Sequence, residues 1–226
     1  VIPILLLKGA GLYKTRRFKD ETYIGDPINA VKIFNDKEVD ELAFLDINAA
    51  RTGADPDFTK LKEIAGECFM PLSYGGGIKS AEMVRELVGI GIEKVIINSE
   101  AYKSSSLITE LATKFGTSTI VGSIDVRRNW IGKEQVYISG GTEKIPLSPV
   151  EWASELERRG AGEILINSID RDGELAGYDL DLISRVSAAV SAPVVAVGGA
   201  SNSADFVLAV GSGASAVAAG SMFVFH

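Results

Sequence analysis

The sequence predicts a (β/α)8 barrel of the TIM type, built from two similar half barrels. Short apolar runs alternate with amphipathic stretches, eight such runs are present, and the two halves of the chain resemble each other. Nearly continuous apolar strands that alternate with helices are typical of a parallel sheet covered by helices. Eight strands favour a closed barrel over an open sheet. We expect one barrel domain over residues 1–226, with both termini incomplete.

The expected strands are rich in β-branched residues, and the expected helices show apolar residues at three- and four-residue spacing. Ser148 and Ser203 are predicted helix N-caps, Gly160 is a predicted helix stop, and residues 126–147 are predicted to contain an inserted hairpin. The predicted strands are 1–7, 41–47, 70–74, 94–98, 119–125, 163–168, 193–197 and 216–219. The predicted helices are 28–39, 80–91, 105–116, 148–160 and 203–213.

An internal repeat supports closure of the barrel. Residues 71–100 resemble residues 193–222, and residues 25–42 follow residues 147–164 at the same offset. The opening stretch VIPILLLKGAG also matches the later stretch IVGSIDVRR, at a slightly shorter offset. A chain made of two similar halves is what a two-fold symmetric barrel requires.

Composition argues against several function classes. The net charge is −7 and the pI is about 4.9, so a nucleic-acid partner is not expected. Cys68 is the only cysteine and His226 the only histidine, which argues against disulfides, an interior histidine base and a His-rich metal site. No apolar run reaches the roughly 18 residues of a membrane span. We therefore expect a cytoplasmic protein with no membrane segment, metal or cofactor.

Glycine-rich ends follow four predicted strands, as two repeated pairs. YGGG (74–77) and INS (97–99) form one pair, and VGG (197–199) and AGS (219–221) form the other. In a barrel these stretches lie at the carboxyl ends of strands, where ligands bind. Glycines allow backbone N–H groups to approach phosphate oxygens, although a single glycine pair is equally typical of a tight turn. The repeated pairs predict two phosphate sites on opposite sides of one mouth.

Asp125 ends the fifth predicted strand, so its carboxylate should point into the mouth. It is the first candidate for general acid–base work, and the alternative is a structural aspartate paired with Arg127 or Arg128. Lys14 lies in the first strand–helix loop, which either folds over a phosphate or is a solvated basic loop. Further carboxylates at the mouth are expected at Asp46, Asp170 and Asp172.

Three charged residues, Glu41, Lys94 and Glu163, directly precede strands and should lie at the opposite, amino-terminal face of the barrel. Charged residues there are usually solvated. A ring of them could instead pair with one another or with a partner protein.

The motifs FLDI, YGGGI, INS, SIDVRR, RRGAGEIL, SIDRDG, GYD and VGGA occur in one order along the chain. As an ordered set they resemble the HisF family, the cyclase subunits of imidazole glycerol phosphate synthase in histidine biosynthesis. The resemblance implies a lyase-type barrel that takes ammonia from a HisH-like glutaminase docked on the amino-terminal face. Ammonia would pass through the barrel core to a bis-phosphorylated ribonucleotide at the mouth.

The resemblance also implies roles for individual residues. Asp125 would be one of two catalytic aspartates, and Lys14 would be the lysine of the mobile loop. Glu41, Lys94 and Glu163 would form the gate of an ammonia channel. The residues implied to bind the phosphorylated substrate are Lys14, Gly76, Gly77, Asn98, Ser99, Gly198, Gly199, Gly220 and Ser221. Asp172 and Gly173 are added from the loop SIDRDGELAGYD, which either organises substrate hydroxyls or is an ordinary turn.

The chain departs from the family pattern at three positions. Leu6 stands where the family has its other catalytic aspartate, Asn167 where it usually has threonine, and Val197 where it usually has serine beside a phosphate. A leucine cannot transfer a proton, and losing one member of an acid–base pair commonly lowers the rate by orders of magnitude. Lys8 or Asp46 could substitute for the missing carboxylate.

The chain thus keeps the charged gate and the phosphate-binding glycines but has lost one catalytic aspartate. In this it resembles one branch of the family, whose opening strand also tends to contain ILLLK. Members of that branch are associated with converting an N-acetyl sugar to an acetamidino sugar in surface-glycan (O-antigen) biosynthesis. We expect this chain to belong to that branch. The alternatives are a histidine-pathway cyclase and a non-catalytic scaffold that activates a glutaminase.

Overall fold

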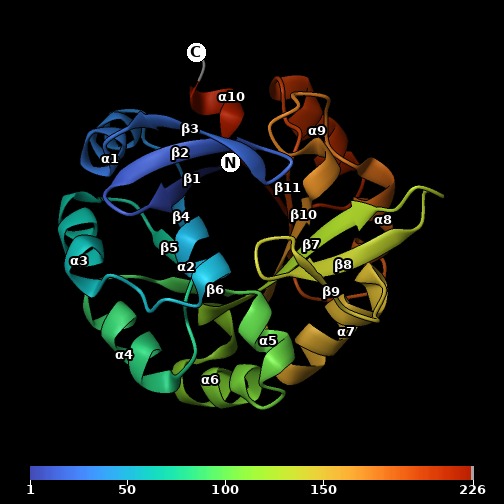
Figure 1. Ribbon diagram of the computed structural model, residues 1–226, viewed down its shortest axis with the longest axis horizontal. Helices are drawn as coiled ribbons and strands as arrows, with labels where there is room; N and C mark the ends of the chain where they lie inside the picture. Colours follow the sequence, from blue (N-terminus) through green and yellow to red (C-terminus); the bar gives the residue numbers. More distant parts are fainter. Residues whose placement is uncertain (225–226) are drawn as a thin grey trace.

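The computed structural model describes residues 1–224, and Figure 1 looks down a barrel of parallel strands ringed by helices. Within these residues the barrel has eight strands, and its last strand returns to its first through the pairs Ile2↔Ala218 and Pro3↔Ala219. The predicted fold class and all eight predicted strands are therefore confirmed. In pairing order the strands are β1 (Ile2–Lys8), β4 (Leu42–Asp46), β5 (Leu72–Gly75), β6 (Lys94–Ile97), β7 (Ile120–Arg128), β10 (Glu163–Ser168), β11 (Val194–Val197) and β12 (Ala216–Ala219).

The helices lie between the strands and pack on the outside of the barrel (Figure 1). Ser148 caps its helix as predicted, in a reciprocal capping box with Glu151. The prediction for Ser203 is wrong, because the preceding Asn202 accepts the capping hydrogen bond and Ser203 is already helical. The helical elements are α1 (Pro27–Asp36), α2 (Ile47–Thr52), α3 (Phe58–Glu67), α4 (Ala81–Gly89), α5 (Ser99–Lys103), α6 (Leu107–Phe115), η1 (Thr117–Thr119), α7 (Pro149–Arg159), η2 (Ile169–Arg171), α8 (Leu180–Ser187), α9 (Ser203–Gly211) and α10 (Ser221–Val224).

The internal repeat of the sequence is a repeat of structure. β5, α4 and β6 in one half begin and end at positions that correspond, at a single offset, to β11, α9 and β12 in the other. The similar halves therefore supply equivalent strand ends to opposite sides of the barrel mouth.

Two antiparallel hairpins extend the barrel at its mouth. The first is formed by β2 (Gly11–Arg16) and β3 (Lys19–Gly25), in the segment that we expected to be a basic loop. The second confirms the predicted insertion: β8 (Glu134–Ile138) pairs with the extended end of β7, and β9 (Glu143–Lys144) pairs with β8. Both hairpins stand beside the strand ends that carry the predicted site.

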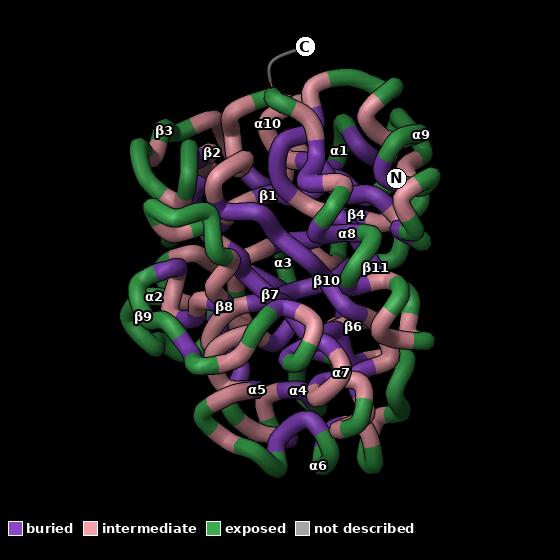
Figure 2. The backbone as a smooth tube through the Cα atoms, turned by 90° about the vertical axis from the view of Figure 1, so that its right-hand side faces the viewer, coloured by how far each residue is buried: buried purple, intermediate pink, exposed green. Residues whose placement is uncertain are grey.

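Apolar side chains form one cluster inside the barrel and another between the barrel and its helices. Buried backbone fills the middle of the molecule and exposed backbone its outer surface (Figure 2). The outer cluster includes Trp152 of α7, which is 1% exposed. The inner cluster consists of Ile2, Ile4, Ala43, Ile96, Val121, Leu165, Val195 and Ala218, with Leu6, Leu45, Val197 and Ala216 packed against it.

Close packing of α7 on β7 leads to the first testable prediction. A Cβ atom at Gly122 would lie 2.9 Å from Leu156 Cδ1 and 3.2 Å from Leu156 Cβ, so Gly122→Ala must displace the Leu156 side chain or the helix that carries it. Such overpacking should lower the free energy of unfolding by about 1–3 kcal/mol in urea denaturation. Gly89→Ala in α4 is the control, because its Cβ meets no atom within 4 Å. An equal or smaller loss at Gly122 than at Gly89 would contradict the packing argument.

Candidate functional site

A cavity of about 310 Å³ opens at the carboxyl ends of the barrel strands. It brings together residues from both halves of the chain and from both hairpins. Every residue that we expected to take part in catalysis or substrate binding lines it. These residues are Lys14, Gly76, Gly77, Asn98, Ser99, Asp125, Asp172, Gly173, Gly198, Gly199, Gly220 and Ser221.

One glycine-lined corner of the cavity follows β5 and β6. Gly77 has φ +70°, and a Cβ atom there would lie 2.2 Å from the carbonyl oxygen of Ala54, so only glycine fits. Asn98 and Ser99 follow the neighbouring strand, and the Ser99 hydroxyl accepts a hydrogen bond from Ser139 N at 2.8 Å. Ser139 could not be predicted from the sequence, because the inserted hairpin supplies it from a distant segment.

The opposite corner follows β11 and β12. Gly199 has φ +109°, and a Cβ atom there would lie 2.2 Å from the carbonyl oxygen of Gly177. A Cβ atom on Gly220 would lie 3.0 Å from the carbonyl oxygen of Ile4. Both corners thus line the cavity with glycine backbone and leave no room for larger side chains, which suits the close approach of an anionic group.

Asp125 lies at the base of the cavity and is 8% exposed. Its carboxylate accepts hydrogen bonds from Asn98 Nδ2 at 3.1 Å and Asn167 Nδ2 at 3.3 Å. Burial raises the pKa of Asp125 to about 7, against the opposing effect of the two amide donors. At neutral pH this carboxyl group can therefore either donate or accept a proton.

The two neighbouring arginines do not neutralise Asp125 by a direct ion pair. Arg127 donates to the carbonyl oxygen of Gly141 at 3.2 Å and stacks over the ring of Tyr137. Arg128 turns away from the cavity toward Asp179. The structural alternative of an arginine-paired Asp125 is therefore wrong, and amides hold this side chain.

Asn167 is the partner that sequence reasoning did not connect with Asp125. The two residues are directly paired between β10 and β7, and Asn167 Oδ1 is buried without a hydrogen-bond partner. A Cβ atom on Gly198 would lie 2.8 Å from that oxygen. Asn167 therefore connects the carboxylate to the second glycine-lined corner.

Leu6 lines the cavity from β1, where it is paired with Leu45 of β4. Of the two possible substitutes for an acid, Lys8 lies outside the cavity and pairs with Glu21. Asp46 does line the cavity, and burial raises its pKa, but its carboxylate caps α2 through Asn48 N and Ala49 N. Neither candidate stands in the place of a carboxylate at Leu6.

The hairpin β2–β3 is fastened over one side of the cavity. Thr15 Oγ1 donates to Asp172 Oδ2 at 2.7 Å, and Phe18 N donates to the same oxygen at 3.2 Å. A Cβ atom on Gly173 would lie 2.2 Å from the carbonyl oxygen of Thr15. Burial raises the pKa of Asp172. The hairpin that carries Lys14 thus closes onto the loop that carries Asp172 and Gly173.

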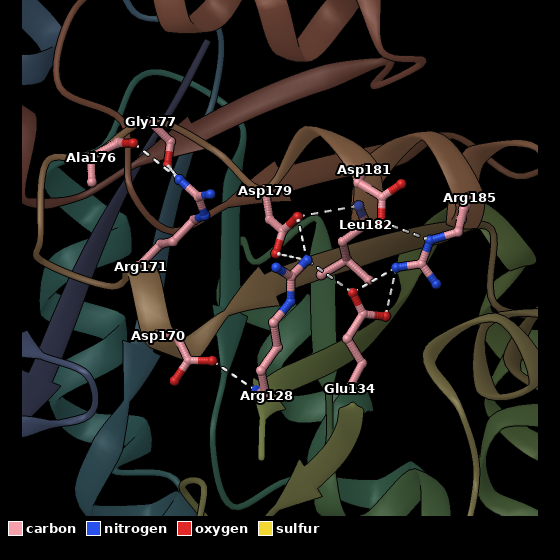
Figure 3. A network of polar contacts seen from close by, with 10 residues as sticks. All are labelled: Arg128, Glu134, Asp170, Arg171, Ala176, Gly177, Asp179, Asp181, Leu182 and Arg185. Carbon is pink, nitrogen blue, oxygen red and sulfur yellow. Dashed lines mark hydrogen bonds and ion pairs between the residues drawn. The ribbon is translucent and has the colours of Figure 1, made fainter. Parts of the chain in front are cut away.

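A polar network fixes the second hairpin at the rim (Figure 3). Arg128 pairs with Asp179 at 2.9 Å and with Glu134 at 3.2 Å, and Arg185 binds both carboxylate oxygens of Glu134 at 2.6 Å. Asp170 accepts from Arg128 N at 2.7 Å and does not line the cavity. The expectation that Asp170 is a mouth carboxylate is therefore wrong, because the hairpin backbone binds it.

The three charged residues at the amino-terminal face form one cluster. Lys94 Nζ lies 2.8 Å from Glu41 Oε2 and 3.1 Å from Glu163 Oε2, and Ser73 Oγ donates to Glu41 at 2.5 Å. Burial alone would lower the pKa of Lys94, but the two carboxylates outweigh it and raise that pKa. We call this group the Glu41–Lys94–Glu163 cluster. The apolar inner cluster lies between it and the cavity.

Within residues 1–224, no group of three His, Cys, Asp or Glu side chains is placed to hold a metal ion. No helix in this part of the chain has the length and apolar character needed to cross a membrane.

Comparison with known proteins agrees with this geometry. A family model described as histidine biosynthesis protein matches residues 1–226. A Pseudomonas aeruginosa protein, provisionally named imidazole glycerol phosphate synthase subunit hisF2, is 51% identical, covering 100% of this chain and 90% of the relative. A Vibrio vulnificus protein, provisionally named subunit hisF3, is 44% identical, covering 100% and 87%. The imidazole glycerol phosphate synthase subunit HisF of Alkaliphilus metalliredigens is 40% identical, covering 100% and 90%. The chain therefore belongs to the histidine biosynthesis protein family, among the HisF-like subunits of imidazole glycerol phosphate synthase.

Proposed function

We propose that this chain is the synthase-type subunit of a cytoplasmic glutamine amidotransferase complex. It receives ammonia from a HisH-like glutaminase at the amino-terminal face and binds a phosphorylated substrate at the mouth. One observation carries the proposal. The same barrel has a cavity with two glycine-lined corners at its carboxyl-terminal opening and the Glu41–Lys94–Glu163 cluster at its amino-terminal opening.

The interior of the barrel suits the passage of ammonia. The residues between the cluster and the cavity are apolar, so a charged ammonium ion would lose its hydration there without compensation. Neutral ammonia carries a much smaller penalty. Lys94, held as a cation between two carboxylates, would exclude other cations at the entrance.

We further propose that the chain is the paralogue that serves acetamidino modification of a sugar in surface-glycan biosynthesis. Leu6 supports this assignment, because the part of β1 that lines the cavity carries no ionisable group, while Asp46 caps α2 and Asp172 fastens the β2–β3 hairpin. The opening ILLLK and the numbered names of two relatives, hisF2 and hisF3, point the same way. The barrel would then mainly activate the glutaminase and deliver ammonia.

The alternative function is histidine-pathway cyclisation. It is favoured by 40% identity to a HisF subunit and by Asp125, whose pKa of about 7 suits proton transfer. With leucine at position 6, however, the ring closure would lack the second catalytic carboxyl group of the family pattern, and Asp46 and Asp172 are engaged in other hydrogen bonds.

The decisive experiment supplies a bis-phosphorylated ribonucleotide and ammonium salt to the isolated protein and follows substrate consumption. We expect negligible turnover by the native chain and an increase of about two orders of magnitude or more in Leu6→Asp. Leu6→Asn is the matched control, because it has the same shape without an ionisable group. Robust turnover by the native chain would contradict the paralogue assignment.

Asp125→Asn tests whether the buried carboxyl group of Asp125 lowers the free energy of unfolding at neutral and higher pH. Because its folded pKa is raised, Asp125 favours folding below about pH 4 and loses that contribution as the pH rises through 7. Asp125→Asn should therefore unfold like the native protein near pH 4 and be more stable above pH 7, by at most about 4 kcal/mol. Urea denaturation at both pH values measures this, with Asp170→Asn as the control outside the cavity. A pH-independent difference would contradict the assigned burial.

Lys94→Met tests the entrance cluster. The substitution leaves Glu41 and Glu163 facing each other without a cation, so we expect about tenfold less stimulation of glutamate release by the partner glutaminase. Lys60→Met on α3 is the matched control, because Lys60 is also half-buried and paired with a glutamate, Glu63, away from the cluster. If Lys94→Met folds and stimulates like the native chain, the cluster has no part in coupling.

A further inference from the structure

Phe69 is an exposed aromatic residue in the short connection between α3 and β5, on the amino-terminal side of the barrel. Its side chain is 86% exposed. Exposed single apolar residues are common, so exposure alone does not identify an interface. Two further features distinguish Phe69: its backbone is fixed, and the segment that follows it contacts Glu41 of the Glu41–Lys94–Glu163 cluster.

The backbone at Phe69 is held by the side chain of Asn35 at the end of α1. Phe69 N donates to Asn35 Oδ1 at 3.1 Å, and Asn35 Nδ2 donates to the carbonyl oxygen of Glu67 at 2.7 Å. One amide group thus bridges both ends of the turn that carries Phe69. A partner that buries the ring would meet a backbone that is already ordered, which reduces the entropy lost on binding.

The chain leads directly from Phe69 to the charged cluster. The carbonyl oxygen of Pro71 accepts from Leu42 N at 3.0 Å, which places the start of β5 beside Glu41. Two residues further, Ser73 Oγ donates to Glu41 itself. A protein that covers the opening around the cluster would therefore extend over Phe69.

We propose that Phe69 is the aromatic anchor of the glutaminase interface and inserts into an apolar pocket of that partner. This inference rests on the proposed function, since the cluster and the anchor would be covered by one protein. Aromatic residues that become fully buried commonly dominate binding energy, while charges at an interface rim contribute orientation and association rate. In this proposal Phe69 supplies most of the affinity for the glutaminase. The charged cluster couples glutamine hydrolysis in the partner to the use of ammonia at the barrel mouth.

The test compares Phe69→Ala with Trp130→Ala in binding to the HisH-type glutaminase of the same organism. Trp130 is 95% exposed at the tip between β7 and β8, on the opposite side of the barrel, so it controls for loss of an exposed aromatic ring. Isothermal titration calorimetry should show binding at least about tenfold weaker for Phe69→Ala and unchanged for Trp130→Ala. Phe69→Leu should recover part of the affinity. Urea midpoints of all variants establish that they fold.

The outcomes separate this inference from the proposed function. If the native chain binds glutaminase and Phe69→Ala binds equally well, the anchor is overturned and the partner stands. If the native chain does not bind glutaminase, the partner assignment fails and the anchor fails with it. Weaker binding by Trp130→Ala alone would place the partner on the mouth side and overturn the anchor. A native dimer that Phe69→Ala abolishes would show that a second copy, not glutaminase, covers this residue.

Discussion

Closure of the barrel is the constraint on which the site depends. Pairing of β12 with β1 brings the carboxyl ends of all the barrel strands to one opening and their amino ends to the other. It also brings Gly220 so close to Ile4 that a side chain there would meet the backbone. Leu6 and Asp125, distant in sequence, face the same cavity because of this closure. The packed apolar interior then separates the cavity at one opening from the Glu41–Lys94–Glu163 cluster at the other.

The sequence was sufficient to predict the barrel because its strands are nearly continuous apolar runs, which the environment of a barrel strand requires on both faces. It was less informative about the outer elements, where α3 and α8 are not among the predicted helices. α3 buries only Leu61 and Ile64, and charged residues lie between them along the helix. The β2–β3 hairpin was missed because β3 has no buried residue and therefore shows no apolar alternation. Its stability comes from contacts with Asp172 that only the folded barrel creates.

The glycine-rich strand ends and Asp125 could be predicted because their position at a strand end fixes where they lie. Their partners could not, because partnership depends on register between strands. Asn167 meets Asp125 through one pairing of β10 with β7, and a shift of one residue would turn it away. Asp170 was misplaced for a related reason: the inserted hairpin supplied a backbone donor that captured it.

The contrast between Leu6 and Asp125 bears on whether the mouth is used at all. Leu6 adds apolar packing at the mouth end of the inner cluster, and so favours the folded state. Asp125 does the opposite: burial raises its pKa, so above neutral pH the fold carries a poorly solvated carboxylate. Two amides, on Asn98 and Asn167, are committed to holding it, and the oxygen of Asn167 is left without a donor. A barrel that served only as a scaffold would be more stable with an apolar residue at this position. The cost of burying Asp125 therefore argues for the proposed ligand-binding mouth and against the alternative of a non-catalytic scaffold.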